Sequence, residues 1–203
     1  MTKPTHIVNQ VIANFRRLVN SDRIAICCSG GADSMALLFC AQKVFRNIYV
    51  IHAMHDMRSK EESQHDADVV RKYCKLNKLD LDIVQVNMRD LDDQVASEAE
   101  YRDERYAQII KNCLLFDYFY AATGHHADDQ LETMIMKICR GSGLRGLSGI
   151  ADSVDKGGIK FVRPLLSITK EDIYDICKTN KIPFVEDASN QNSDYTKIGR
   201  AHV

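Results

Sequence analysis

A serine- and glycine-rich turn follows directly on a short apolar run near the start of the chain. The run, Ile24–Cys28, is continuously apolar, which is typical of a strand buried on both faces of a parallel sheet. The turn reads SGGADS and leads into a predicted helix. Glycines let backbone approach phosphates closely, and the turn's N–H groups with the positive helix end hold negative charge. The candidate phosphate ligands are Ser29, Gly30, Gly31, Ala32, Asp33 and Ser34.

The side chains of this turn add to its backbone. Ser29 and Ser34 can donate hydroxyl hydrogen bonds, and Asp33 is the candidate Mg²⁺ ligand. The turn matches neither the Walker pattern nor G-x-G-x-x-G. Its other interpretation is a strand-to-helix turn whose glycines serve geometry alone.

A second polar cluster ends the next apolar stretch. Ala53, His55 and Arg58 are candidates for contact with an adenine, its ribose or a phosphate. The alternative is a solvated loop, and His52 can equally finish a strand as a core histidine.

Two arginines three residues apart follow later in the chain. Arg102 and Arg105 share one face of a predicted helix, where a pair of guanidinium groups suits a phosphate or a carboxylate. Their alternative role is that of surface charges paired with Glu98 and Asp103.

The segment ATGHHADDQLET carries histidines and carboxylates after a predicted strand. Gly124 and His125 are candidate nucleotide contacts there. Asp129 and Glu132 share a helix face and can bind a metal or an ammonium group, whereas Asp128 can cap the helix. Adjacent histidines point in different directions, so they do not indicate a zinc site.

A basic, glycine-rich stretch completes the chemistry-bearing residues. Flexible backbone with arginines suits RNA phosphates, although a plain surface loop has the same composition. The candidate RNA contacts are Lys137, Arg140, Arg145 and Arg163.

Alternating helices and strands must position these residues. Periodicity and capping residues predict helices over 5–19, 33–45, 59–76, 96–115, 128–139 and 169–179. Predicted strands cover 24–28, 47–53, 81–86, 118–122 and 159–162. The alternation predicts an α/β fold, a doubly wound and mostly parallel sheet with helices on both faces. Ligands of such sheets lie beyond the carboxyl ends of the strands, where the polar segments fall.

Composition fits one cytoplasmic domain. The chain has 203 residues, 45% of them hydrophobic and 27% charged, and a net charge of −1 gives no global attraction to nucleic acid. Its seven cysteines form no C-x-x-C and are expected to be reduced. No signal-peptide core and no run of membrane-spanning length occur in the sequence, so we expect no membrane.

Taken in order, these segments resemble the tRNA(Ile)-lysidine synthetases, a family of PP-loop ATPases. The family pattern runs S-G-G-x-D-S, H-x-x-H-x-x-R, E-x-x-x-R-x-x-R-Y, H-H-x-D-D-Q-x-E-T, R-G-S-G-L-x-G-L, R-P-L-L and E-D-x-S-N. Every segment occurs here in that order, between about residues 20 and 196.

The resemblance implies a two-step reaction with ATP and Mg²⁺. The C2 oxygen of a wobble cytidine in tRNA(Ile) attacks the α-phosphate of ATP, and pyrophosphate leaves. The ε-amine of free L-lysine then displaces AMP from C2 to give lysidine.

The resemblance also implies roles for particular residues. Asp33, with Mg²⁺, would offset charge on the phosphates. Asp129 and Glu132 would hold the amines of lysine, and Arg105 or Arg102 would hold its carboxylate. Members of the family are often dimeric, which makes a homodimer an expectation.

The chain departs from the family in two places. Met54 stands where an acidic or amide residue is common. After residue 196 the chain reads KIGRAHV instead of R-N-x-x-R followed by tRNA-binding regions. Back-translation of IGRAHV matches a common sequencing-library adapter. We therefore expect a synthetase domain over 1–196, a non-native tail over 197–203 and absent C-terminal tRNA-binding domains.

Two other functions fit part of the pattern. A related PP-loop enzyme that thiolates tRNA would need paired cysteines, which the chain lacks. A non-catalytic ATP-binding module would need no second constellation of acids and arginines, and the chain has one.

Overall fold

The apolar run before the glycine-rich turn forms β1 (Arg23–Cys27), a central strand of a six-stranded sheet. Its residues Ile24, Ala25 and Ile26 are fully buried, as expected for a strand covered on both faces. The chain is described by a computed structural model over residues 3–55, 60–86, 97–141 and 148–186.

The sheet is parallel except at one edge. Its strand order is β3-β2-β1-β4-β6-β5, and only β5 runs antiparallel to its neighbour. The bounds of the other strands are β2 (Asn47–His55), β3 (Asp80–Val86), β4 (Tyr120–Ala122), β5 (Ser153–Lys156) and β6 (Ile159–Val162).

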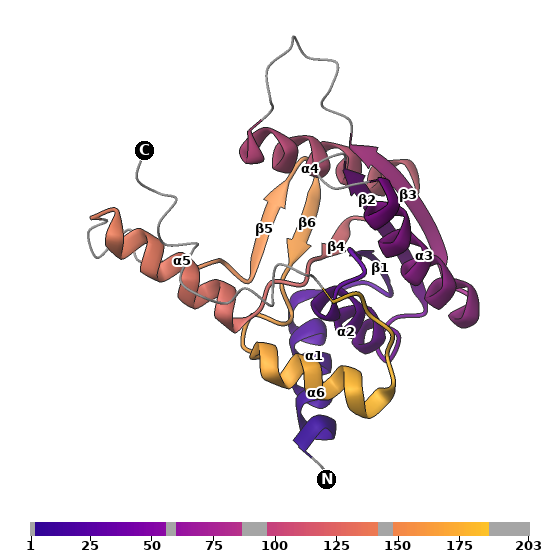
Figure 1. Cartoon of the computed structure of the whole chain (residues 1–203), viewed down its shortest axis with the longest axis horizontal. Coiled ribbons are helices and arrows are strands. Elements are labelled where there is room, and N and C mark those ends of the chain that lie inside the picture. Colours follow the sequence, from indigo (N-terminus) through magenta and orange to yellow (C-terminus); the bar gives the residue numbers. More distant parts are fainter. Residues whose placement is uncertain (1–2, 56–59, 87–96, 142–147, 187–203) are drawn as a thin grey trace.

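Helices cover both faces of this sheet (Figure 1). The helices are α1 (Lys3–Leu18), α2 (Ala32–Ala41), α3 (Lys60–Asn77), α4 (Glu98–Leu115), α5 (Ala127–Cys139) and α6 (Lys170–Asn180). Residues of α1, α2, α3 and α6 form the larger core with one face, while α4 packs on the other through Tyr106, Ile109 and Cys113. The predicted doubly wound α/β sheet is confirmed.

Strand order reverses at β1. The chain moves outward from β1 through β2 to β3 and then returns to place β4 on the other side of β1. In open α/β sheets, ligands bind at such a switch point, beyond the carboxyl ends of the two strands. The glycine-rich turn follows β1 and the His-Asp segment follows β4, so both meet there.

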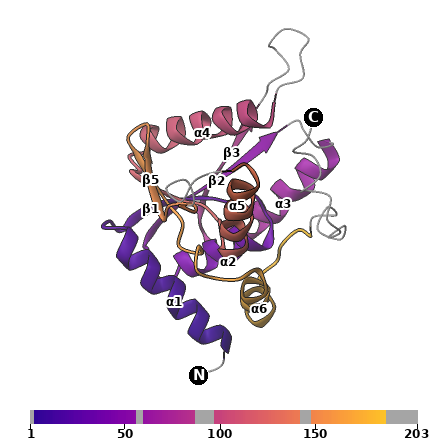
Figure 2. The ribbon, with the colours of Figure 1, turned by 90° about the vertical axis from the view of Figure 1, so that its left-hand side faces the viewer.

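Helix α5 differs from the others because it projects from the body (Figure 1) and points toward the viewer in Figure 2, and none of its residues is buried. Its attachment includes Gln130, whose amide bonds the N–H and the carbonyl of Ile150 at 2.5 and 2.8 Å. A Cβ on Gly149 would lie 2.0 Å from the Gln130 oxygen, so glycine keeps this contact open.

The predicted elements are confirmed with shifted ends and one omission. Helix α2 ends at Ala41. The chain continues in tighter turns, in which the Lys43 N–H donates to the Cys40 carbonyl and the Val44 N–H to the Ala41 carbonyl. Strand β5 is absent from the sequence prediction. The helix cap predicted at Ser59 lies outside the described residues.

Candidate active site

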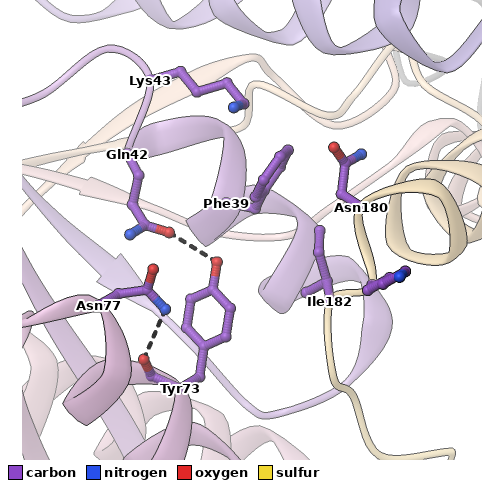
Figure 3. A pocket seen from close by; sticks show the side chains of 8 residues that line it. Phe39, Gln42, Lys43, Tyr73, Asn77, Asn180 and Ile182 are labelled. Atoms are coloured by element: carbon purple, nitrogen blue, oxygen red, sulfur yellow. Dashed lines mark hydrogen bonds between the residues drawn. The ribbon is translucent and has the colours of Figure 1, made fainter.

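Among the cavities lined by described residues, two are of similar size. One, of about 340 Å³, lies beside the C-terminal ends of α2, α3 and α6 and is lined by Phe39, Tyr73 and polar side chains (Figure 3). No segment that the sequence marks for chemistry lines it. The other, of about 330 Å³, opens at the carboxyl ends of β1, β2 and β4 and is the candidate active site.

Segments distant in sequence converge on this second cavity. Its walls combine an apolar side with polar and charged groups, the combination that a nucleotide needs. The lining residues are Cys27, Cys28, Ser29, Asp33, Ser34, Ile51, Ala53, Arg105, Tyr106, Ile109, Thr123, Gly124, His125 and Asp129.

Ser34 organises the glycine-rich turn from inside. Its buried hydroxyl oxygen accepts the N–H groups of Ser29 and Gly30 at 3.1 and 3.2 Å, and its own proton goes to the Gly31 carbonyl at 3.0 Å. These bonds fold the backbone around the start of α2, whose N-cap Gly31 supplies no side-chain cap. The N–H groups in the first turn of α2 are thus available to an external acceptor, as an anion-binding helix start requires.

Two glycines are required by close approach. Gly30 has φ +95°, and a Cβ there would lie 3.2 Å from the Asp66 carbonyl oxygen. A Cβ on Gly124 would come within 3.3 Å of Asp33 and of the Ser34 nitrogen. The loop after β4 therefore lies directly against the start of α2.

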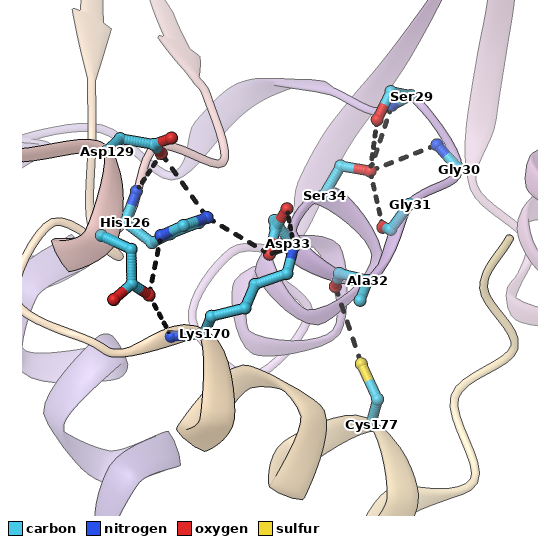
Figure 4. A network of polar contacts seen from close by, with 11 residues as sticks. Ser29, Gly30, Gly31, Ala32, Asp33, Ser34, His126, Asp129, Lys170 and Cys177 are labelled. Atoms are coloured by element: carbon cyan, nitrogen blue, oxygen red, sulfur yellow. Dashed lines mark hydrogen bonds and ion pairs between the residues drawn. The ribbon is translucent and has the colours of Figure 1, made fainter. Parts of the chain in front are cut away.

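Asp33 lies in a network of charged groups at this point (Figure 4). Lys170 Nζ donates to both Asp33 carboxylate oxygens at 2.7 Å. His126 Nε2 lies 3.8 Å from Asp33 Oδ1 and 3.6 Å from Asp129 Oδ2, and its Nδ1 is 3.5 Å from Asp128 Oδ2. Neither Lys170 nor this position of His126 was predicted from the sequence.

The residues present fit Mg²⁺ only in part. Asp33 provides a carboxylate beside the open first turn of α2, but no group of three or more His, Cys, Asp or Glu in the described ranges is placed to hold a metal. A Mg²⁺ ion at Asp33 would thus take most of its ligands from phosphates and water, as this ion commonly does.

The cavity is also lined by Arg105 from α4 and Asp129 from α5. Asp129 Oδ2 also accepts the His126 N–H at 2.8 Å, which fixes the carboxylate at the helix start. A guanidinium and a carboxylate in one cavity can hold the carboxylate and an amine of an amino acid.

His125 also lines the cavity and is held there as a neutral imidazole. Burial, with the charge of Arg163 second, lowers its pKa to about 4. Its Nδ1 lies 2.9 Å from Thr123 Oγ1, whereas the neighbouring His126 faces three carboxylates. The two histidines thus have different partners.

Of the other predicted residues, some line the cavity, some lie elsewhere in the fold and some fall outside the described ranges. Glu132 and Arg102 are exposed one turn away from Asp129 and Arg105, and Ala53 lines the cavity. His52 is buried and its Nδ1 lies 2.8 Å from the Cys28 carbonyl, in agreement with the core alternative. Arg58, Arg145 and the His55 side chain lie outside the described residues, as does the whole segment 187–203.

Two expectations are corrected by the contacts. Arg163 is only 7% exposed, and its guanidinium donates to the Ala151 carbonyl at 2.7 Å, so it is not placed to contact a tRNA. Asp128 does not cap its own helix: its Oδ2 accepts the Lys170 N–H at 2.7 Å and so caps α6, while Asp129 closes the start of α5. Of the basic candidates, Arg140 is exposed and Lys137 donates to the Ser148 carbonyl.

The thiols that line the cavity are poor nucleophiles. Burial raises the pKa of Cys28 to about 11 and raises that of Cys27 further. Both thiols therefore stay protonated at neutral pH.

Comparison with known proteins agrees with this geometry. A family model described as a PP-loop domain matches residues 4–201. The chain belongs to the PP-loop family. Membership in this ATP-binding family supports ATP as the nucleotide of the turn at 29–34, hereafter the PP-loop.

Curated relatives of this PP-loop chain share about a third of its residues. It is 35% identical to a tRNA(Ile)-lysidine synthase of Bacillus subtilis over 181 residues and 31% identical to that of Symbiobacterium thermophilum over 195. The matches cover 86% and 94% of this chain but only 38% and 40% of those proteins. The chain thus spans less than half the length of these relatives.

Solved structures share the fold of this PP-loop chain at low identity. A U34-tRNA thiolase from Methanococcus maripaludis with a 4Fe–4S cluster aligns with TM-score 0.68 and 16% identity, over 90% of this chain and 67% of its own. An NMN synthetase from Francisella tularensis aligns with TM-score 0.61 and 11% identity, over 89% and 70%. In the described part of the PP-loop chain, no helix is long and apolar enough to cross a membrane.

Proposed function

We propose that this chain is the catalytic domain of a tRNA(Ile)-lysidine synthase. It would ligate free lysine to C2 of the wobble cytidine through an adenylated cytidine, releasing AMP and pyrophosphate in the cytoplasm. The observation that carries the proposal is a single cavity lined both by residues of the PP-loop and by Arg105 and Asp129. Curated lysidine synthases at 31–35% identity support the same reaction.

ATP would lie across the carboxyl ends of β1 and β4. Its phosphates would meet the PP-loop backbone and the first turn of α2, next to Asp33. Its adenine would enter the apolar side formed by Ile51, Ala53 and Ile109. Mg²⁺, when bound with the phosphates beside Asp33, supplies positive charge that stabilises the departing pyrophosphate.

Lysine would bind between Arg105 and Asp129. The guanidinium would hold its carboxylate, and the Asp129 carboxylate would hold an amine near the activated base. Glu132 would be a second ligand of the amine. It is exposed one turn along α5 from Asp129 and lies outside the cavity lining. Arg102 is likewise exposed outside the cavity lining and would contribute positive charge near the site.

The amine must lose a proton before it attacks C2. His125 lines the cavity, and its lowered pKa keeps it neutral at neutral pH, so that it could accept a hydrogen bond from the amine. Protonated thiols at Cys27 and Cys28 fit this reaction better than a sulfur-transfer chemistry.

tRNA(Ile) would reach the cavity past α5. Arg140 at the end of that helix is exposed and available to a phosphate, and Lys137 lies one turn before it. The protein would form a homodimer, and no step of the proposed reaction depends on the second subunit.

Pyrophosphate release tests the reaction class. The natural protein should release pyrophosphate from ATP only with a tRNA(Ile) transcript carrying the wobble cytidine, and lysine should convert the adenylated product to lysidine. Release that depends on a sulfur donor, or that needs no RNA, would contradict the proposal. A transcript with uridine at the wobble position is the matched control.

A further inference from the structure

A second cavity lies away from the residues that the proposed reaction uses. It has a volume of about 340 Å³ and is bordered by the C-terminal ends of α2, α3 and α6 (Figure 3). None of its lining residues lines the active site. Helix α2 joins the two places, because it starts at Ala32 beside the PP-loop and spans ten residues, or about 15 Å, to its end at Ala41. The volume of this second cavity falls within the range of small-ligand sites.

Part of the wall of this cavity is apolar and flat. Tyr73 and Ile182 are buried there, and Phe39 is half-buried. The Tyr73 hydroxyl donates to Gln42 Oε1 at 2.8 Å, which fixes the phenol ring at this wall (Figure 3). Two aromatic rings beside an aliphatic side chain suit the face of a planar heterocycle.

Three side-chain amides supply polar groups at the same cavity. Gln42 uses its oxygen for Tyr73, and its NH₂ group donates to no partner among the described residues. Asn77 and Asn180 donate their NH₂ groups to the backbone carbonyls of Tyr73 and Ile176, at 2.9 and 2.8 Å. Within the described ranges, the oxygens of these two asparagine amides accept no hydrogen bond. A free donor group with free acceptors beside it matches the edge of a nucleobase, which presents both.

Positive charge is concentrated around this cavity. Lys43 and Lys181 line it, and the Lys43 ammonium lies 4.2 Å from the centroid of the Phe39 ring. No ion pair joins either lysine to a carboxylate in the part of the chain that the structure describes. The segments 39–46, 72–79 and 176–184 contain the three helix ends. They hold two, three and two lysines or arginines and no aspartate or glutamate, in a chain whose net charge is −1.

This charge exceeds what the helix ends themselves attract. A helix C-terminus carries roughly half a negative charge, so three ends offset about 1.5 positive charges. The cations of the three segments therefore leave a positive surplus beside the cavity, which attracts an anion. An inorganic anion would need only the lysines, whereas the rings and the amides indicate a ligand that also has a flat polar ring.

We propose that this cavity binds a nucleotide unit, either free or within a single strand of RNA. The base lies against Phe39 and Tyr73 with its edge on the three amides, and the phosphate meets Lys43 and Lys181. Both sources offer the same chemistry, a planar base with a phosphate one sugar away. This site is independent of the reaction proposed above, because the two cavities share no lining residue.

Photolabelling of the full chain tests both sources. One arm uses 8-azidoadenosine monophosphate, and the other uses a single-stranded RNA of about ten nucleotides that contains 4-thiouridine. Mass spectrometry of the digested protein locates the adducts, which separates labelling at this cavity from labelling near the PP-loop. The variants are Lys43→Ala, Lys43→Arg and the control Lys111→Ala, whose lysine is exposed on α4 at the other face of the sheet. Thermal unfolding checks that each variant folds.

A phosphate contact at Lys43 has a selective signature. At least one probe should label the lining residues of the second cavity in the unmodified protein. The half-saturating probe concentration for that labelling should rise about fivefold or more in Lys43→Ala, because a charge-assisted contact is lost, and stay within about twofold in Lys43→Arg and Lys111→Ala. Labelling near the PP-loop should be unchanged in every variant. Adducts from the free nucleotide, from the RNA or from both identify the source.

Absence of adducts at this cavity with both probes would overturn the inference, whatever occurs near the PP-loop. A half-saturating concentration that Lys43→Ala shifts no more than Lys111→Ala does would overturn it as well, because the labelling would then not depend on this lysine. Labelling near the PP-loop alone removes the second site and keeps the proposed function. Labelling at the second cavity alone keeps this site and counts only against the proposed function.

Discussion

At the scale of single residues, several polar groups of the active site already have fixed partners. Ser34 holds the amides of Ser29 and Gly30, and Asp129 holds the His126 N–H. Such pre-formed bonds keep side chains and backbone in position before a ligand binds, which lowers the cost of ordering them on binding.

His125 gives a residue-scale prediction about pH. Its pKa is about 4 in the folded protein and about 6.5 when unfolded, because burial disfavours the charged imidazole. Between pH 4 and pH 6.5, His125 therefore binds a proton in the unfolded state that it does not bind in the folded state. Its contribution to stability is fully present above pH 6.5 and is lost as pH falls toward 4, by up to ~3 kcal/mol.

Denaturant unfolding at pH 7 and at pH 4.5 checks this prediction. His125→Asn keeps a polar atom near Thr123 Oγ1 but cannot titrate, so it should lose less stability over that interval than the unmodified protein. Parallel losses in the two proteins would refute a neutral His125.

At the scale of elements, α5 and α6 bring the later residues to the PP-loop. Strands β1 and β4 are neighbours, so the turns after them meet without further support, whereas α5 has no buried residue of its own. Its placement depends on contacts at its start and on Gln130, which bonds Ile150 twice.

Removing the Gln130 side-chain amide should weaken the attachment of α5 to the rest of the fold. Gln130→Ala deletes two hydrogen bonds, so hydrogen exchange of the α5 amides should accelerate about tenfold while that of α2 stays unchanged. Gln64→Ala on α3, whose side-chain amide donates to the exposed Asp68 at 2.9 Å, is the control. Unchanged exchange in α5 would mean that other contacts hold the helix.

Sequence reasoning finds local elements and misses long-range partners. Periodicity finds the helices and parallel strands, but the prediction lacks β5, although Gly157 and Gly158, both with positive φ, mark a hairpin turn after it. The corrections at Asp128 and Arg163 and the omission of Lys170 have one cause. Each depends on a partner from another element, and no spacing within a single segment encodes that partner.

At the scale of the whole molecule, one switch point of the sheet joins two chemistries. The PP-loop after β1 and the Asp129 segment after β4 are a hundred residues apart in sequence and line the same cavity of about 330 Å³. The reversal of strand order at β1 makes this possible, because it places β4 beside β1. Phosphate binding and amino-acid binding are thus expected to be separable by mutation.

Equilibrium binding of L-lysine and of ATP to Asp129→Asn tests this central claim most directly. Asparagine keeps an acceptor for the His126 N–H and removes the charge that would hold the amine. Asp155→Asn, an exposed change on β5, is the control. The predicted result is a loss of lysine affinity of about tenfold or more with ATP affinity within about twofold. Unchanged lysine binding, or equal losses for both ligands, would contradict it.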